Sequence, residues 1–364
     1  MYRPLILGQG QSGKSAFRLF LKENIIPVLY DDQSKTAVDF SLIDRVVVSP
    51  GFTQEHPLIQ RAYEKGIKVQ SEVDLALEKM RSGCLIGITG SNGKSTCVKK
   101  LEHVFNSLGF KAKALGNIEI PLSSEDLGGY DIVVIEMSAQ QLETTHSRVL
   151  DLGVILNIQP NHLDRYHTME RYEQVKRKIF DLVKEGGSCF GPKTSMEEIW
   201  DWVARKFSIE KEKIYEALTT YQNLPHRLEY LGDFFGKKIY NDSKSTTISS
   251  TLYALNAVEG PVQLILGGRS KGENLLSFRE NFLKSPLKRI LAIGETMHII
   301  KEIFDPKIEV VLCETLEKAV DEGLKGEGNL LLSPGFASYD QFNSYAHRGE
   351  SFKQRIEWEK KMLS

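Results

Sequence analysis

Two glycine-rich turns in this sequence have the residue types needed to bind phosphate groups. Residues 8–15 read GQGQSGKS, which fits the phosphate-loop pattern G-x-x-x-x-G-K-S at every position. Residues 87–96 read GITGSNGKST, which has the same ending but carries Ile88 where the first glycine should stand. Backbone amides of such turns can bind phosphate oxygens, and the lysine can reach the terminal phosphates. The residues around each turn must decide which one holds a triphosphate.

The first turn is surrounded by the signals of a diphosphate-binding unit. It follows an expected strand at 5–7 and precedes a helix expected to begin near Ser15, and the next expected strand leads into Asp31. In this interpretation Asp31 lies near a ribose, and Lys14 is a solvated residue of the first helical turn. A tight turn that binds nothing is the alternative, because a glycine motif of this kind is weak evidence alone. The residues expected along the diphosphate are Gly8, Gly10, Ser12 and Gly13.

The second turn has the better surroundings for a triphosphate. An apolar strand at 85–89 leads into it, and a helix is expected over 98–108. A further strand, 132–135, delivers Glu136 at its carboxyl end, where an acidic residue can hold a metal ion directly or through water. A solvated strand end is the alternative for Glu136. We therefore expect ATP and Mg²⁺ here, with Ser95 as a metal ligand, and the ATP-binding residues are Gly90, Ser91, Asn92, Gly93, Lys94, Ser95 and Thr96.

Composition excludes several classes of partner. The 364 residues include 47 basic and 48 acidic side chains, and neither sign forms a long block that would bind a nucleic acid or a membrane. The four cysteines are widely spaced, which predicts neither disulfides nor a zinc site. No apolar run is long enough for a signal peptide or a membrane span. These features predict a cytoplasmic protein.

Short apolar strands alternate with helical stretches, the pattern of an α/β fold with mostly parallel sheets. Charged or turn-rich segments near residues 79–83 and 221–225 are typical of domain boundaries, and they predict three domains, 1–82, 83–222 and 223–364. We expect a Rossmann-like fold for the first and third, and a central parallel sheet like that of P-loop ATPases for the second. The expected strands are 5–7, 28–30, 46–48, 85–89, 132–135, 153–157, 263–266, 290–293 and 330–332.

Several stretches, in order along nearly the whole chain, resemble the Mur ligase family, and within it the ligases that add D-glutamate. They are VVVSPGF (46–52), ITGSNGKST (88–96), LGNIEIPL (115–122), IEMSAQQLETT (135–145), ILNIQPNHLDRYHTMERYEQVKRKIF (155–180), LPHRLE (224–229), YNDSKSTTISST (240–251), LILGGRSKG (264–272) and LLSPGFASYDQF (331–342). The resemblance implies a monomeric, ATP-dependent amide ligase of peptidoglycan synthesis, whose substrates are UDP-N-acetylmuramoyl-L-alanine and D-glutamate. It also implies an acyl phosphate as the intermediate.

The resemblance also implies roles for individual residues of the first two domains. The first turn would bind the UDP part of the substrate. The turn that matches the phosphate-loop pattern at every position would therefore not be the ATP site. His162 and Glu136 would help to hold Mg²⁺, and Lys176 is the position that related ligases carbamylate. Without the resemblance, Lys176 reads as a solvated helix residue and His162 as a hydrogen-bonded loop histidine. The remaining substrate contacts would be Ser49, Pro50, Gly51, Asn117 and Ser138, of which the last two could instead be turn or capping residues.

In the third domain the resemblance places Arg227 on ATP phosphates and Asp242 on the ATP ribose. The D-glutamate pocket would contain Lys244, Thr246, Lys271, Ser338 and Tyr345. For Thr246 and Ser338 a purely stabilising role is an equal alternative.

The chain departs from the family pattern in four ways. It is short, and the missing length lies after Phe180, so residues 181–220 form a trimmed region. The asparagine that relatives offer to adenine is not found. Arg269 stands where an aspartate is usual, and Tyr345 stands where a phenylalanine is usual.

Other function classes stay open on the residues alone. One is a sister ligase with another amino acid, or a folate polyglutamate synthase. The others are a nucleotide-dependent dehydrogenase that uses the first turn and a non-catalytic P-loop switch.

Overall fold

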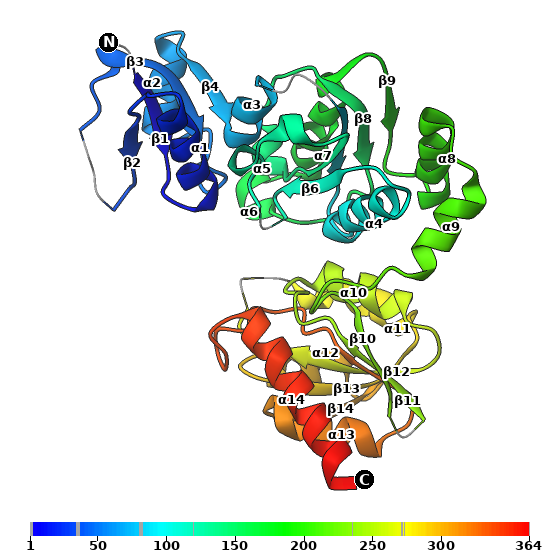
Figure 1. Ribbon diagram of the computed structural model, residues 1–364. Helices are drawn as coiled ribbons and strands as arrows, with labels where there is room; N and C mark the ends of the chain where they lie inside the picture. Colours follow the sequence, from blue (N-terminus) through cyan, green and yellow to red (C-terminus); the bar gives the residue numbers. More distant parts are fainter. Residues whose placement is uncertain are drawn as a thin grey trace. The chain divides into compact units, whose positions relative to one another are not determined.

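The computed structural model describes residues 3–33, 37–79, 83–118, 120–234, 236–270, 272 and 274–363 (Figure 1). The chain divides into two compact units, Met1–Tyr221 and Gln222–Ser364. The first unit contains two separate sheets and the second contains one.

The first sheet has the order β2-β1-β3-β4, and all its strands are parallel. Its members are β1 (Arg3–Leu7), β2 (Val28–Tyr30), β3 (Ile43–Val48) and β4 (Lys68–Ser71). Helix α2 (Pro57–Glu64) packs on one face through Ile59 and Ala62, and α1 (Gln11–Lys22) and α3 (Glu72–Leu77) pack on the other. Apolar side chains therefore cover both faces of these short strands, as expected for a parallel sheet.

The second sheet is also parallel, with the order β6-β7-β5-β8-β9. Its members are β5 (Cys84–Thr89), β6 (Ala112–Gly116), β7 (Ile132–Glu136), β8 (Leu150–Ile155) and β9 (Val183–Phe190). Helix α4 (Lys94–Ser107) covers one face, and α5 (Ala139–Leu142) and α7 (Met169–Arg177) cover the other (Figure 1). The shorter segments between these elements are α6 (Leu163–Tyr166) and the 3-10 turns Leu122–Ser124, Leu127–Gly129 and Lys178–Leu182, and a further 3-10 turn, Phe40–Leu42, precedes β3 of the first sheet.

The region that the sequence marks as trimmed folds into a pair of helices, α8 (Met196–Phe207) and α9 (Lys211–Thr219). Helix α9 packs on α4, and the ring of Phe207 lies 5.0 Å from that of Phe105 on α4. Ser195 and Glu198 form a capping box that fixes the start of α8. In the trimmed region, β9 (Val183–Phe190) thus extends the second sheet, and α9 packs on the helix that follows the second glycine turn.

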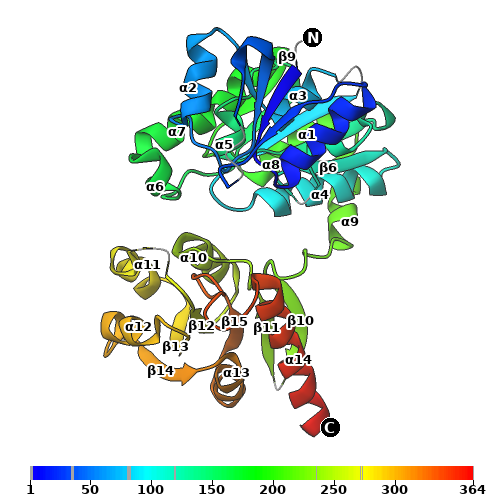
Figure 2. The same ribbon diagram turned by 90° about the vertical axis from the view of Figure 1, so that its left-hand side faces the viewer.

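The second unit has one mixed sheet of order β10-β11-β15-β12-β13-β14, in which β10 is antiparallel to β11 and the other pairs are parallel (Figure 2). Its strands are β10 (Glu229–Phe234), β11 (Lys237–Asn241), β12 (Val262–Gly267), β13 (Leu287–Ile293), β14 (Glu309–Glu314) and β15 (Asn329–Leu332). One face packs against α10 (Ile248–Ala257), α11 (Arg279–Leu283), α12 (Met297–Phe304) and the 3-10 turn Leu275–Phe278. The other face packs against α13 (Leu316–Lys325) and α14 (Tyr345–Leu363).

The α/β fold class is confirmed, and every expected strand coincides with an observed one or lies within it, apart from the end of 153–157. Strand β8 stops at Ile155, and α1 begins at Gln11 instead of near Ser15. The earlier start of α1 follows from Gly8 and Gly10, which turn the chain within three residues. The three-domain division stays a prediction. Among the described residues no helix has both the length and the apolar character needed to cross a membrane.

Candidate active site

The two glycine turns have different backbone registers, although their letters are similar. In the first turn, β1 ends at Leu7 and α1 begins at Gln11, so Lys14 is the fourth residue of its helix and is exposed. In the second turn, β5 continues to Thr89 and α4 begins at Lys94 itself. A helix N-terminus presents free backbone amides to an anion, and only in the second turn does the lysine stand at that end.

The first turn is built for close backbone approach. Gly8 has a positive φ of 99° and donates its N–H to the Tyr30 carbonyl at 2.9 Å. A Cβ on Gly13 would stand 1.9 Å from the Gly8 carbonyl oxygen, so only glycine fits there. The Ser49 N–H donates to the Leu7 carbonyl at 2.9 Å. These contacts bring Gly8–Gly13 and Ser49 together at the carboxyl edge of the first sheet, next to the chain that continues from β2 into Asp31.

The second turn is held open by a neighbouring loop that follows β8. Gly93 caps α4 with a φ of 81°, a conformation that favours glycine. The Ser91 hydroxyl donates to the Gln159 carbonyl at 2.9 Å, and the Asn92 N–H donates to the Asn157 side-chain oxygen at 2.9 Å. The Lys94 ammonium donates to the carbonyls of Gly90 and Ser91, at 2.9 and 3.0 Å. The turn therefore has a fixed shape, with the ammonium held over its own backbone.

A chain of polar groups lies at the start of α4, with a buried pair, Ser95 and Glu136, and an exposed member, Asn117. The Ser95 hydroxyl donates to one oxygen of Glu136 at 2.6 Å, and the Asn117 amide donates to the other at 3.0 Å. Ser95 and Glu136 are each 2% exposed. Because β5, β6 and β7 are parallel, their carboxyl ends meet at one edge of the sheet, and this brings the three side chains together.

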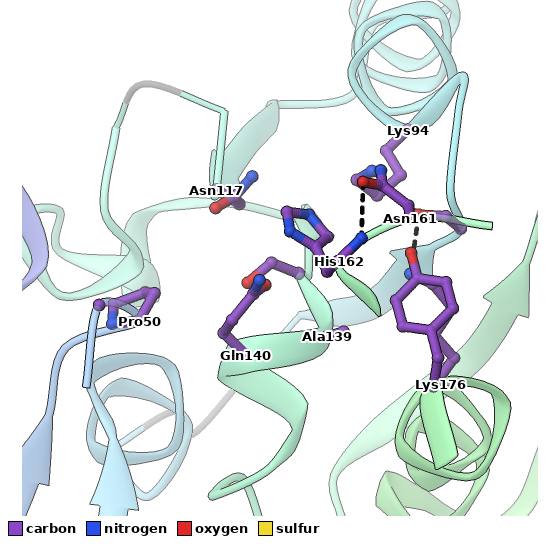
Figure 3. Close-up of a pocket in the computed structure, with 12 residues that line it drawn as sticks. Pro50, Lys94, Asn117, Ala139, Gln140, Asn161, His162 and Lys176 are labelled. Carbon is purple, nitrogen blue, oxygen red and sulfur yellow. Dashed lines mark hydrogen bonds between the residues drawn. The ribbon is translucent and has the colours of Figure 1, made fainter. Parts of the chain in front are cut away.

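A cavity of about 360 Å³ opens at this edge (Figure 3). One wall is the Pro50–Gly51 turn that follows β3 of the first sheet. The other walls come from the second sheet and its helices, and Figure 3 shows side chains such as Asn117, His162 and Gln140 gathered around the space. The residues that line it are Pro50, Gly51, Gly90, Lys94, Asn117, Ser138, Ala139, Gln140, Asn161, His162, Tyr172 and Lys176.

Lys176 is a buried residue, so the alternative that places it on a solvated helix face is wrong. It is 1% exposed, and its amine donates to the Gly90 carbonyl at 2.8 Å and to the Thr89 hydroxyl at 3.3 Å. Burial and the nearby Lys94 ammonium lower the pKa of Lys176 well below its usual value, and the Glu136 carboxylate opposes this shift only in part. The amine therefore has a much greater neutral fraction than a surface lysine.

His162 and Ser138 lie at the cavity in different roles. His162 is exposed, has a φ of 54°, and stands directly before α6, with its ring centroid 6.5 Å from that of Tyr172. Ser138 is the N-cap of α5 and forms a capping box with Gln141, and it also lines the cavity, so it has a capping role and its contact with the substrate stays a prediction. Within the described ranges, no group of three or more His, Cys, Asp or Glu side chains is arranged to hold a metal ion.

In the second unit, Asp242 is buried between two loops. Its carboxylate accepts from the Leu228 N–H at 3.0 Å and from the Ser333 hydroxyl at 2.7 Å. Burial raises the pKa of Asp242 to about 6, although these hydrogen bonds and the neighbouring Arg227 oppose the rise. Arg227 itself is half-buried in the same loop.

The other expected residues of the second unit gather only in part. The Lys244 ammonium donates to the Tyr345 hydroxyl at 2.7 Å and lies 4.3 Å from its ring centroid. Ser338 is buried and Thr246 is half-buried, whereas Lys271 lies outside the described residues. Arg269 forms an ion pair with Glu295 at 2.7 Å, which compensates the unusual charge at that position.

Sequence reasoning missed two arginines, Arg348 and Arg165, each of which makes four side-chain hydrogen bonds. Arg348 is 1% exposed and donates to the carbonyls of Ser243 and Phe336, at 3.0 and 3.2 Å, and its burial lowers its pKa to about 10. Arg165 joins α6 to the Pro50 turn through carbonyl acceptors. No sequence signal singles them out, because most of their acceptors are backbone carbonyls and all of them lie in segments distant along the chain.

The sequence relatives of this chain and the solved structures that share its fold agree with one another. The description "Mur ligase middle domain" matches residues 88–277. The UDP-N-acetylmuramoylalanine--D-glutamate ligase of Protochlamydia amoebophila is 31% identical, over 97% of this chain and 97% of the relative. The corresponding ligase of Chlamydia pneumoniae is 33% identical, over 97% and 98%. The first alignment runs over 437 positions, so that relative has residues without a counterpart in these 364.

Solved structures of low identity share the fold. UDP-N-acetylmuramate-alanine ligase MurC of Thermotoga maritima has a TM-score of 0.56 at 14% identity, over 99% of this chain and 100% of that one. MurF ligase of the same organism, solved with ADP, has a TM-score of 0.55 at 17% identity, over 98% and 96%. The match to the middle-domain description and the near full-length identity with the two D-glutamate ligases show that this chain belongs to the Mur ligase family.

Proposed function

We propose that this chain is an ATP-dependent ligase that joins D-glutamate to UDP-N-acetylmuramoyl-L-alanine in peptidoglycan synthesis. The near full-length similarity to ligases of that name supports the reaction and its substrates. The observation that carries the assignment of ATP is the register of the second turn, in which α4 begins at Lys94.

ATP would bind with its phosphates on Gly90–Thr96. The free amides at the start of α4 would receive phosphate oxygens, and Lys94 would move from the carbonyls of its own loop to the terminal phosphates. Three hydrogen bonds from Ser91 and Asn92 to Asn157 and Gln159 hold the shape of this loop. They do not use the backbone amides at the start of α4. Preorganised donors of this kind stabilise the charge that develops on a phosphoryl group during transfer.

The residues beside Lys94 fit a magnesium ion by their donor chemistry. Ser95 offers a hydroxyl oxygen 2.6 Å from the Glu136 carboxylate, and Mg²⁺ prefers such oxygen ligands. His162 faces the same cavity and would complete the set with Lys176, if the latter is carbamylated. When bound, the ion would neutralise phosphate charge as it redistributes.

Lys176 is suited to carbamylation because its amine is neutral far more often than usual. A neutral amine can attack carbon dioxide, forming a carbamate and releasing one proton, whereas an ammonium cannot. The product carries a negative charge beside Lys94, so the repulsion that adds to burial in lowering the pKa of the free amine would become an attraction. The change would turn a group that repels a metal ion into one that attracts it.

The UDP part of the acceptor would lie along Gly8, Gly10, Ser12 and Gly13, with Asp31 near the ribose. The Ser49-Pro50-Gly51 turn would continue this surface into the cavity, where Asn117 and Ser138 would contact the muramoyl-alanine part. In the second unit, Arg227 and Asp242 would serve ATP, and Lys244, Thr246, Lys271, Ser338 and Tyr345 would serve D-glutamate. The paired charges of Arg269 and Glu295 argue against a direct role for Arg269 in carboxylate binding.

The chemistry would proceed in two displacements. An oxygen of the alanine carboxylate attacks the γ-phosphorus, and the bond to ADP breaks. The amine of D-glutamate then attacks the carbonyl carbon of the acyl phosphate, loses a proton, and the carbon–oxygen bond to phosphate breaks. Lys94 and Arg227 would neutralise the anions that must approach one another, and a closed cavity would protect the acyl phosphate from water.

Phosphate release from ATP tests this proposal. We expect release only when UDP-N-acetylmuramoyl-L-alanine and D-glutamate are both present, and little release with L-glutamate, lysine or no amino acid. Stimulation by lysine would assign the chain to another branch of the family. Nucleotide binding without any amide product would support a non-catalytic P-loop protein instead.

A further inference from the structure

We propose that Arg165 is a positioning residue that fixes the Pro50–Gly51 wall of the cavity for the UDP-containing substrate. The inference rests on the proposed function and adds a residue to it. Arg165 touches neither the second glycine turn nor the buried Ser95–Glu136 pair, so it would act on one substrate and not on ATP.

The guanidinium of Arg165 donates to three residues, through two backbone carbonyls and one carboxylate. Its Nη1 donates to the Pro50 carbonyl and one Nη2–H donates to the Phe52 carbonyl, each at 2.8 Å. Its Nε and Nη2 donate to the two oxygens of Glu143, at 3.0 and 2.7 Å. The side chains of Arg165 and Glu143 are only 13% and 8% exposed, so solvent screens the pair weakly.

These contacts join three walls of one cavity. Pro50 and Gly51 belong to the turn after β3, and the two carbonyls that Arg165 holds bracket Gly51. Glu143 directly follows α5, whose first residues Ala139 and Gln140 line the cavity. Arg165 lies on α6 and donates its backbone N–H to the His162 carbonyl at 3.0 Å. A single side chain therefore sets the distance between the turn of the first sheet and two loops of the second.

Glu143 is itself anchored, which makes the arrangement rigid. Its Oε2 also accepts from the Gln54 amide at 3.3 Å, and its backbone carbonyl accepts from Lys178 at 3.0 Å. Gln54 follows the same turn as Pro50, so the carboxylate reaches the turn directly as well as through Arg165. A lysine could not replace the arginine, because one ammonium cannot reproduce a planar fork that serves a carboxylate and two carbonyls.

The expected consequence is a change in affinity for one substrate. If the guanidinium is lost, the Pro50–Gly51 turn is free to move away from the other walls, and the acceptor is held less well. Loss of hydrogen bonds from a charged group typically weakens binding by about ten- to a hundredfold, so we expect the KM for UDP-N-acetylmuramoyl-L-alanine to rise by about that factor while kcat changes little. The KM for ATP, measured at saturating acceptor, should stay near that of the unchanged protein.

The experiment compares Arg165→Gln and Arg165→Lys with Arg45→Gln in the full chain. Arg45 also pairs with a carboxylate of the first unit, at 3.4 Å from Glu78, but it contacts no part of the cavity. Initial rates give the two KM values and kcat, and calorimetry gives direct binding of the acceptor. We expect both Arg165 variants to lose acceptor affinity and Arg45→Gln to keep it.

Glu143→Gln completes the test, because it removes the charge of the partner while it keeps the shape. We expect its acceptor KM to rise as well, and the double variant to be no worse than Arg165→Gln alone, as required of residues that act as a unit. An acceptor KM within about twofold of the unchanged value in Arg165→Gln would overturn the inference. A normal acceptor KM in Arg165→Lys would also overturn it, because the positive charge alone would then be sufficient. A fall in kcat with a lowered melting temperature and no change in KM would overturn it too, because Arg165 would then serve only stability. If the unchanged protein binds no acceptor, the proposed function fails instead.

Discussion

Lys14 and Lys94 end the same run of letters, yet their ammonium groups have different surroundings. Lys14 is exposed on the first turn of α1, whereas Lys94 is half-buried and bound to the carbonyls of Gly90 and Ser91. A cation can assist phosphoryl transfer only where the phosphates lie.

We therefore expect Lys94→Ala to abolish substrate-dependent phosphate release and Lys14→Ala to cause at most a small loss. Phosphate release measured with both substrates checks the pair, and the melting temperature of each variant serves as the control for folding. Equal losses in the two variants would mean that ATP has been assigned to the wrong turn.

Asp242 gives a prediction about pH, because burial raises its pKa to about 6. A carboxyl with a raised pKa in the folded state stabilises that state fully below its unfolded pKa, near 4, and loses this contribution as the pH rises through 6. Asp242→Asn removes the charge and keeps an acceptor for the Leu228 N–H. Relative to the unchanged protein, the variant should gain roughly 2 to 3 kcal/mol of unfolding free energy between pH 4 and pH 7.

Urea unfolding of both proteins at several pH values measures this difference, and the activity of the variant should fall if Asp242 serves ATP. A stability difference that is the same at pH 4 and pH 7 would contradict the raised pKa. A gain in stability together with a loss of activity is expected of a residue that is kept for function.

For single residues, the sequence predicts those that belong to contiguous motifs. It does not predict those whose contacts lie in segments far away along the chain. The segments 88–96 and 132–136 were sufficient to bring Ser95 and Glu136 together, because parallel strands end at one edge. Burial of Lys176 was not predictable from its own helix, which is strongly charged. It follows from the contact of α7 with the end of β5.

The shape of the first glycine turn depends on the three-residue connection between β1 and α1. Such a short connection requires the backbone of Gly13 to pass against the Gly8 carbonyl, and a Cβ would meet that oxygen at 1.9 Å. Gly10 has a φ of −69° and nothing within 4 Å of its missing Cβ. The two glycines of one motif therefore have different requirements.

We expect Gly13→Ala to destabilise the chain by about 1 to 3 kcal/mol and to weaken acceptor binding. Gly10→Ala should change stability by less than about 1 kcal/mol, because alanine fits its conformation and restricts the unfolded chain, which offsets its weaker N-capping of α1. Thermal unfolding followed by circular dichroism compares the two. If both variants lose the same stability, close packing at Gly13 is not the cause.

Among the elements, buried apolar strands were predictable and polar edge strands were not. Strand β9 has the sequence VKEGGSCF, whose glycines and charges read as a loop, yet its backbone pairs with β8. Strand β10 is also an edge strand and mixes polar with apolar residues. Helices α8 and α9 were not predicted, because the family resemblance identifies residues 181–220 only as a region shorter than in relatives. The amphipathic pattern and the capping box at Ser195 could have indicated α8.

On the scale of the whole chain, each of the two units has its own hydrophobic cores. One centres on β1 and β3, one on β7 and α7, and two cover the faces of the sheet in the second unit. Proteins with separate cores commonly unfold in more than one step. The residues assigned to the UDP-containing substrate all belong to the first unit.

We therefore expect calorimetry to resolve two unfolding components. UDP-N-acetylmuramoyl-L-alanine alone should raise the midpoint temperature of one of them, because its binding adds RT ln(1 + [L]/Kd) to the free energy of unfolding of that component. Gly13→Ala should shift that same component, and Asp242→Asn should shift the other. One cooperative transition that both variants move equally would show that the units unfold together.

The different starting points of α1 and α4 have a geometric consequence for how such sequences are read. An α-helix turns about 100° and rises about 1.5 Å per residue, so a lysine at the fourth position leaves the axis about 300° around and about 4.5 Å along from one at the first position. Matching letters thus aim two side chains in different directions. Pattern searches that ignore where a helix starts will put the triphosphate on the wrong half of proteins built like this one.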